Sequence, residues 1–249
     1  MNAEDIKSVG IVGGGVMGGG IAMTFAQAGY AVIIRDISDG QIEKTKGTIQ
    51  RGRFGWDGAV ERGKYTRDEV EQFAGRLTFT TRLEDLAGVD LVIEAVPEDL
   101  DLKKQVWSEL DRVIKPEAVF ATNTSGFDMD SLSQAVERRD RFIGMHWFSP
   151  ANIMKVVELV YTPATSEGTI ELMEEVCRRI GRTSVRVKDA PGSYGFIANR
   201  VYFAAVAEAR KIVEAGIATA EDVDTAMKLG YNWPSGPLEM FRGAQSGWQ

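Results

Sequence analysis

The sequence has 249 residues, of which 44% are hydrophobic and 26% are charged, as in an ordinary globular protein. Its formal net charge of −7 argues against nucleic acid and anionic membranes as partners. No apolar run reaches the length of a membrane span, and residues 1–7 lack a basic segment leading into an apolar core, so a cytoplasmic or equivalent location is expected. The length allows one large domain or two smaller ones.

The first predicted unit is a strand, a glycine turn and a helix. An apolar run of strand type covers residues 9–12, and a helical pattern follows over 21–29. The glycines between them satisfy G-x-G-x-x-G, and Asp36 ends the next predicted strand about 20 residues on, where a carboxylate binds the ribose 2′-OH of NAD and repels a 2′-phosphate. The pattern therefore favours NAD over NADP as the cofactor. The residues expected to bind it are Gly13, Gly15, Val16, Met17, Gly18 and Asp36.

A basic segment follows the second strand. Residues 40–50 are compatible with a helix, and glycines interrupt the pattern over 51–58. Residues 41–67 carry seven basic and three acidic side chains, which form either a solvated helical surface or an anion-binding patch. Thr66 and Glu69 then predict a capping box that opens a short helix.

Strands and helices alternate over the next hundred residues, as in a doubly wound, mostly parallel sheet. The apolar run 89–96 is typical of a strand buried on both faces of such a sheet, and Glu98 and Ser125 follow strand ends, where ligands collect. The single cysteine, Cys177, lies on an apolar helical stripe and is expected in the core. The helix predicted over 100–114 has core spacing at Leu102, Val106, Leu110 and Val113. Further predicted elements are strands 77–80, 118–121, 141–150, 154–160 and 184–187, and helix 166–180.

His146 is the only histidine, and it lies in a predicted strand that ends in polar residues. A lone histidine is often structural, but its place in a nucleotide-binding sheet makes it a candidate catalyst. Glu158 interrupts the next strand, which is otherwise apolar. An inward carboxylate there needs a partner such as an imidazole, whereas strand alternation also allows Glu158 to face solvent.

Chain breakers dominate residues 188–195, and the sequence beyond them is helical. We therefore expect a Rossmann-type α/β domain over 1–188 and a smaller, all-helical C-terminal domain over 189–249. Helices are predicted over 196–215 and 220–229, and a third starts at Gly236 and ends early.

The segments Asn123-Thr124-Ser125, His146 to Pro150 and Met154 to Glu158 together resemble the L-3-hydroxyacyl-CoA dehydrogenase family, which includes 3-hydroxybutyryl-CoA dehydrogenases of fatty acid metabolism and β-oxidation. The resemblance extends over nearly the whole chain, from the glycine turn to Gly-Pro-Leu-Glu at 236–239. It implies reversible NAD-dependent oxidation of an L-3-hydroxyacyl-CoA by a homodimer.

The resemblance also implies the roles of individual residues. His146 would remove the 3-hydroxyl proton, Glu158 would orient its ring, and Ser125 and Asn199 would bind substrate oxygens. An imidazole titrates close enough to neutral pH to serve as base and acid. The positions that face the cofactor in the family are matched by Asp36, Glu98, Lys103 and Asn123.

The chain departs from the family pattern at several places. Gly126 and Ser149 replace a second serine and an asparagine, and Ser193-Tyr194-Gly195 is a three-residue insertion before the helix of Asn199. The segment from Phe241 onward does not resemble the family, so a shortened C-terminal domain is expected. Two alternatives stay open: a related dehydrogenase of a free 3-hydroxy acid, and a dinucleotide-binding protein without catalysis.

Overall fold

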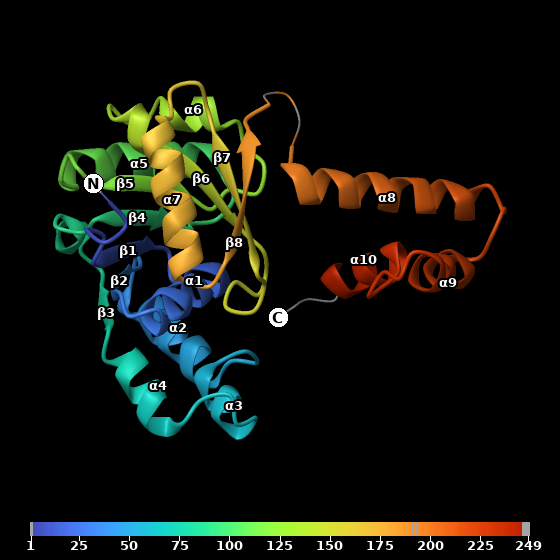
Figure 1. Ribbon diagram of the computed structural model, residues 1–249, viewed down its shortest axis with the longest axis horizontal. Coiled ribbons are helices and arrows are strands. Elements are labelled where there is room, and N and C mark those ends of the chain that lie inside the picture. The colour runs from blue at the N-terminus through green and yellow to red at the C-terminus, as the bar shows by residue number, and fades with distance from the viewer. Residues whose placement is uncertain (1, 191, 193, 246–249) are drawn as a thin grey trace. The chain divides into compact units, whose positions relative to one another are not determined.

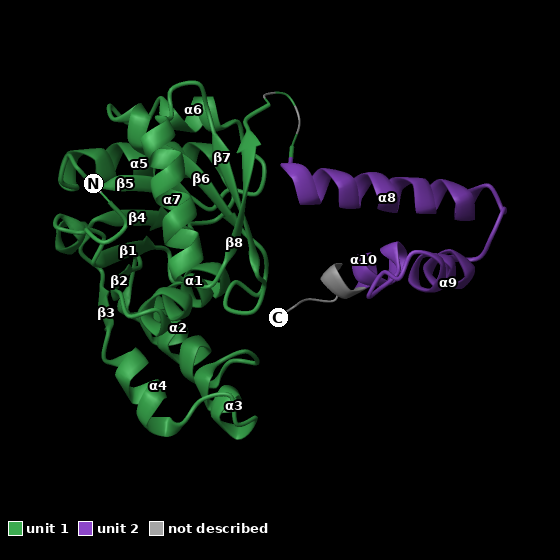
Figure 2. Ribbon diagram, in the orientation of Figure 1, with its two compact units in different colours: residues 1–194 green, residues 195–249 purple. Residues whose placement is uncertain are grey.

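A computed structural model describes residues 2–190, 192 and 194–245, the last three by their backbone alone. Its internal contacts divide the chain into two units, Met1–Tyr194 and Gly195–Gln249 (Figure 2). The division falls shortly after Lys188, where the sequence analysis places the domain boundary. Ser193 of the insertion and residues 246–249 lie outside the described residues.

Unit 1 is built on one eight-stranded sheet of order β3-β2-β1-β4-β5-β6-β7-β8 (Figure 1). All neighbouring strands are parallel except β6 and β7, which are antiparallel. The order confirms the predicted doubly wound, mostly parallel fold. The strands are β1 (Ser8–Val12), β2 (Ala31–Arg35), β3 (Leu77–Thr80), β4 (Leu91–Glu94), β5 (Val119–Thr122), β6 (Phe142–Trp147), β7 (Val156–Tyr161) and β8 (Thr183–Lys188).

Helices cover both faces of this sheet (Figure 1). On one face α1 (Val16–Gln27) and α7 (Glu167–Arg179) join a core that includes Phe25 and the fully buried Cys177. Burial raises the pKa of the Cys177 thiol to about 12, as expected for a core cysteine. On the other face Trp107 of α5 (Leu100–Val113) packs against Phe120 and Phe142, with ring centroids 5.1 and 5.0 Å away.

The orientation of α5 differs from the prediction at one position. Leu102, expected in the core, is 36% exposed, whereas the neighbouring Lys103 is fully buried. Val106 and Leu110 are buried as predicted. The difference arises because the Lys103 ammonium pairs with the buried carboxylate of Glu94, which the spacing of apolar residues cannot reveal.

The remaining helices of unit 1 are shorter or lie nearer the β3 side of the sheet, as α3 and α4 do in Figure 1. The predicted capping box of α4 is present, with Thr66 and Glu69 bonded reciprocally. The glycine-interrupted segment contains the short helix α3, which the sequence did not predict. These elements are α2 (Asp39–Arg51), α3 (Trp56–Glu61), α4 (Arg67–Ala74), α6 (Met129–Ser133) and the 3₁₀ turns Leu83–Leu86 and Arg139–Arg141.

In its described residues, 195–245, unit 2 has three helices: α8 (Ile197–Glu214), α9 (Ala220–Gly230) and α10 (Pro237–Gln245). Asp224 of α9 accepts the Leu238 N–H at 2.8 Å and pairs with Arg242 at 3.1 Å, so it fixes the start of α10. The expectation that this last helix ends early is wrong, because α10 continues to Gln245. In the described part of the chain, no helix has both the length and the apolar character of a membrane span.

Candidate active site

The glycine turn between β1 and α1 has two positions at which a side chain would collide with backbone atoms. Gly13 has a φ of +96°, and a Cβ there would lie 2.7 Å from the Ala95 carbonyl oxygen. A Cβ on Gly18 would lie 1.8 Å from the Gly13 carbonyl oxygen, where α1 crosses the turn. Glycine is required at both positions for the backbone to pack.

Gly15 is different, because no atom lies within 4 Å of the place a Cβ would occupy. It is the N-cap of α1, where no side chain caps the helix and no acidic residue lies in the first turn. Val16, the first helical residue, is 58% exposed. Open space over a helix N-terminus fits a pyrophosphate, so the residues at this turn fit a dinucleotide.

Asp36 is held at the end of β2, beside the glycine turn. Its Oδ2 accepts the N–H of Gly14 at 2.7 Å, and its Oδ1 accepts the N–H of Ile37 at 2.7 Å. Thr45 of α2 donates to the Gly14 carbonyl oxygen at 2.8 Å. The turn is therefore fixed from both sides, and the contribution of Thr45 had no signal in the sequence.

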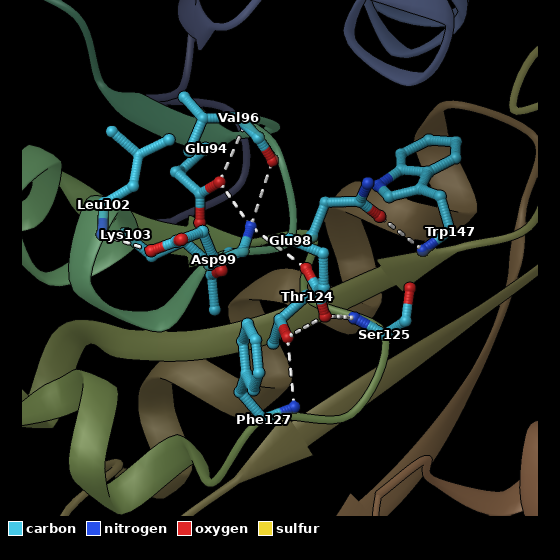
Figure 3. A network of polar contacts seen from close by, with 12 residues as sticks. Glu94, Val96, Glu98, Asp99, Leu102, Lys103, Thr124, Ser125, Phe127 and Trp147 are labelled. Carbon is cyan, nitrogen blue, oxygen red and sulfur yellow. Dashed lines mark hydrogen bonds and ion pairs between the residues drawn. The ribbon is translucent and has the colours of Figure 1, made fainter.

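The other residues predicted to face the cofactor lie at the ends of β4 and β5. Glu98 accepts the Ser125 N–H and the Thr124 hydroxyl, both at 2.7 Å (Figure 3). Asn123 accepts the Trp147 N–H at 2.9 Å and so joins the end of β5 to β6. Lys103 does not reach the surface but lies between Glu98 and the buried Glu94, a residue that the sequence analysis missed because it lies in an apolar strand.

Tyr194, in the inserted segment, lies against the same loops. Its hydroxyl is 3.5 Å from Glu98 Oε1, and its ring meets Phe127 edge to face with centroids 6.2 Å apart. Burial, and then the charge of Glu98, raise the pKa of Tyr194. In the sequence, Tyr194 is marked only by its place in the three-residue insertion.

His146 and Glu158 are brought together at the carboxyl end of β6. His146 Nδ1 lies 2.7 Å from Glu158 Oε2, and the two residues are 3% and 1% exposed. Glu158 therefore faces the imidazole and not solvent. Such a pair fixes the orientation and tautomer of the ring and stabilises its protonated form.

Asn199 belongs to unit 2, in the first turn of α8, and is half buried. Its contribution to the site of unit 1 stays a prediction.

The family model for the NAD-binding domain of 3-hydroxyacyl-CoA dehydrogenase matches residues 8–190, and the model for the C-terminal domain of that enzyme matches residues 195–247. The chain belongs to the 3-hydroxyacyl-CoA dehydrogenase family. A mitochondrial hydroxyacyl-coenzyme A dehydrogenase of Rattus norvegicus is 37% identical over 239 residues, which cover 95% of this chain and 75% of that protein. A probable 3-hydroxybutyryl-CoA dehydrogenase of Deinococcus radiodurans is 37% identical over 233 residues, 93% of this chain and 81% of that protein.

The crystal structure of (S)-3-hydroxybutyryl-CoA dehydrogenase from Ralstonia eutropha superposes with a TM-score of 0.89 at 36% identity, covering 94% of this chain and 80% of that one. These similarities confirm the predicted family, the fold, the NAD cofactor and an NAD-dependent dehydrogenase. One expectation is wrong: the match to the family's C-terminal domain extends to residue 247, so the sequence from Phe241 to that residue does resemble the family.

Proposed function

We propose that this 3-hydroxyacyl-CoA dehydrogenase catalyses the reversible oxidation of L-3-hydroxyacyl-CoA to 3-ketoacyl-CoA, with His146 as general base and acid. The observation that carries the proposal is the buried His146–Glu158 pair at the carboxyl end of β6. Ligands of doubly wound sheets bind at this edge.

The pair supports an assignment of which ring nitrogen would exchange the proton. Because Nδ1 of His146 lies against Glu158, Nε2 would take the proton of the 3-hydroxyl group and return it in the reverse reaction. The carboxylate of Glu158 would stabilise the imidazolium formed in that step. NAD, when bound, supplies the acceptor for the hydride that leaves the substrate carbon.

The remaining site residues would bind and orient the two ligands. Gly15, with the amides of Val16 and Met17, would receive the pyrophosphate on the turn that Gly13 and Gly18 allow, and Asp36 would bind the ribose. Ser125 and Asn199 would bind substrate oxygens. Glu98, Lys103 and Asn123 would shape the nicotinamide side of the site.

The acyl-CoA partner is supported by the basic segment 41–67. This segment forms α2, α3 and the turn before α4, and its surplus of positive charge suits the phosphates of CoA. Binding of CoA to the protein with and without Arg51→Ser and Arg53→Ser tests this part of the proposal.

The decisive test is NADH oxidation with acetoacetyl-CoA by the wild type and by His146→Gln. Wild-type turnover that falls by about 10²- to 10⁴-fold in the variant, with NADH binding retained, would support the proposed base. Equal turnover by both proteins would overturn it. NADPH and free acetoacetate, tested in parallel, separate NAD from NADP specificity and a CoA thioester from a free acid.

We further propose a homodimer in a cytoplasmic or equivalent compartment. Unit 2 exposes several large apolar side chains, which a second copy would cover: Ile197, Val201, Phe203, Ile217, Leu229, Tyr231 and Met240. Light scattering of the purified protein distinguishes a dimer from a monomer, and fractionation of the source cells tests the location.

A further inference from the structure

Three charged side chains lie in a row at the carboxyl end of β4. Lys103 Nζ is 2.6 Å from Glu94 Oε1 and 3.3 Å from Glu98 Oε2 (Figure 3). The side chains of Lys103 and Glu94 are 1% and 0% exposed, and that of Glu98 is 30% exposed. The ammonium is thus held more closely by the buried carboxylate than by the one at the site.

Glu94 is fixed on both of its oxygens. Oε1 also accepts the Val96 N–H at 2.8 Å, and Oε2 accepts the Thr122 hydroxyl at 2.6 Å. Val96 lies just beyond β4 and Thr122 ends β5, so Glu94 ties together the two strands that carry the site loops. A buried carboxylate with this many donors is held in one orientation.

Glu98 extends this network to the substrate loop. Its Oε1 accepts the N–H of Ser125 and the hydroxyl of Thr124, and the same hydroxyl accepts the Phe127 N–H at 3.1 Å. The positions of Thr124, Ser125 and Phe127 therefore depend on the position of one carboxylate.

We propose that Glu94 is a positioning residue for the substrate-binding loop 123–127. It holds the Lys103 ammonium 2.6 Å from its own Oε1, against 3.3 Å to Glu98 Oε2, so that Glu98 Oε1 stays bound to the Ser125 N–H. Without the charge of Glu94, the ammonium has Glu98 as its remaining anionic partner and draws it inward, away from the Ser125 N–H. The proposal rests on the proposed function, because Ser125 is assigned there to the substrate.

Glu94→Gln is the first variant, because the amide oxygen can still accept from Lys103 and the amide N–H₂ can donate to the Thr122 hydroxyl. We expect its kcat/KM for acetoacetyl-CoA to fall about 10- to 100-fold, since a displaced site group costs that much. NADH affinity, measured by fluorescence titration, is expected to fall less than kcat/KM, because the glycine turn and Asp36 lie outside this network. The double variant Glu94→Gln/Lys103→Met removes the ammonium as well and is expected to recover part of the loss.

Asp90→Asn is the matched control. Asp90 immediately precedes β4, at the amino end of that strand and so away from the site. Its carboxylate binds Lys115, the Ser8 hydroxyl and the N–H groups of Lys7 and Ser8 in a similar network. The Asp90→Asn variant is expected to have a lower melting temperature than the wild type and an unchanged kcat/KM.

Hydrogen exchange of the peptide that contains residues 123–127 gives a readout independent of turnover. Exchange should be faster in Glu94→Gln and slower again in the double variant. Wild-type-like exchange in Glu94→Gln, a double variant worse than the single one, or a parallel loss of NADH affinity would each overturn the proposal. Absence of wild-type turnover with the expected exchange pattern would instead count against the proposed function alone.

Discussion

His146 and Glu158 occupy directly opposed positions of the antiparallel strands β6 and β7, and their side chains meet at 2.7 Å. Opposed residues of an antiparallel pair project to the same face of the sheet. The single antiparallel pairing in the sheet is therefore what brings these two side chains together.

Glu158→Gln tests whether this contact serves catalysis. The amide cannot stabilise an imidazolium as a carboxylate does, so kcat is expected to fall at least about 100-fold while NADH affinity is retained. Steady-state kinetics and fluorescence titration measure the two effects. A kcat close to that of the wild type would show that the pair is structural.

Gly15→Ala is expected to affect cofactor binding, whereas Gly18→Ala is expected to affect the stability of the fold. A methyl group at Gly15 meets open space, so the fold should keep its stability while the affinity for NADH falls. At Gly18 the methyl group would collide with the Gly13 carbonyl oxygen, at a cost of about 3 kcal/mol in the free energy of unfolding. Urea unfolding and NADH titration of both variants check this contrast, and an equally destabilised Gly15→Ala would contradict it.

Asp36→Ser should weaken the preference for NADH over NADPH by about tenfold or more, because a charged hydrogen-bond acceptor and its repulsion of a 2′-phosphate are both lost. Part of the loss will come from the glycine turn, since Asp36 also binds the Gly14 N–H. The ratio of the two dissociation constants, rather than either one, is the quantity to measure. An unchanged ratio would show that Asp36 only braces the turn.

Asp90 is expected to make the protein sensitive to acid. Burial by itself would raise the pKa of Asp90, but hydrogen bonds from Lys115, Lys7 and Ser8 outweigh it and hold the pKa below its ordinary value. The unfolded chain then binds a proton more readily, so this carboxylate stabilises the fold above the ordinary aspartate pKa and loses that effect as pH falls through the folded value. Melting temperatures of the wild type and Asp90→Asn should converge as the pH falls below about 4. A constant difference at all pH values would contradict this.

The predictions made directly from the residues succeeded where the relevant groups are neighbours in the chain. The glycine turn, the carboxylate at the end of β2 and the capping box at Thr66 each depend on a few consecutive residues and one local conformation. The apolar runs likewise predicted the parallel sheet, because strands covered on both faces need such runs.

Charged groups inside the sheet were predicted less accurately. Lys103 was passed over for Leu102 as a core residue, although Lys103 is the one that is buried. Glu94 had no distinguishing signal within its apolar strand. Both are buried because each satisfies the other, and a buried charge can be predicted only when its partner is known.

The sequence by itself determined the doubly wound fold, the glycine turn for NAD and the family, because these follow from local patterns and motifs. The tertiary structure decided that Glu158 faces His146, that Glu94 faces Lys103, and that Glu98 holds the backbone of Ser125. These contacts join residues on different strands, helices and loops. They depend on strand order and register, which bring together charged groups that are far apart in the sequence. In the low-dielectric interior such groups are stable only when they are paired.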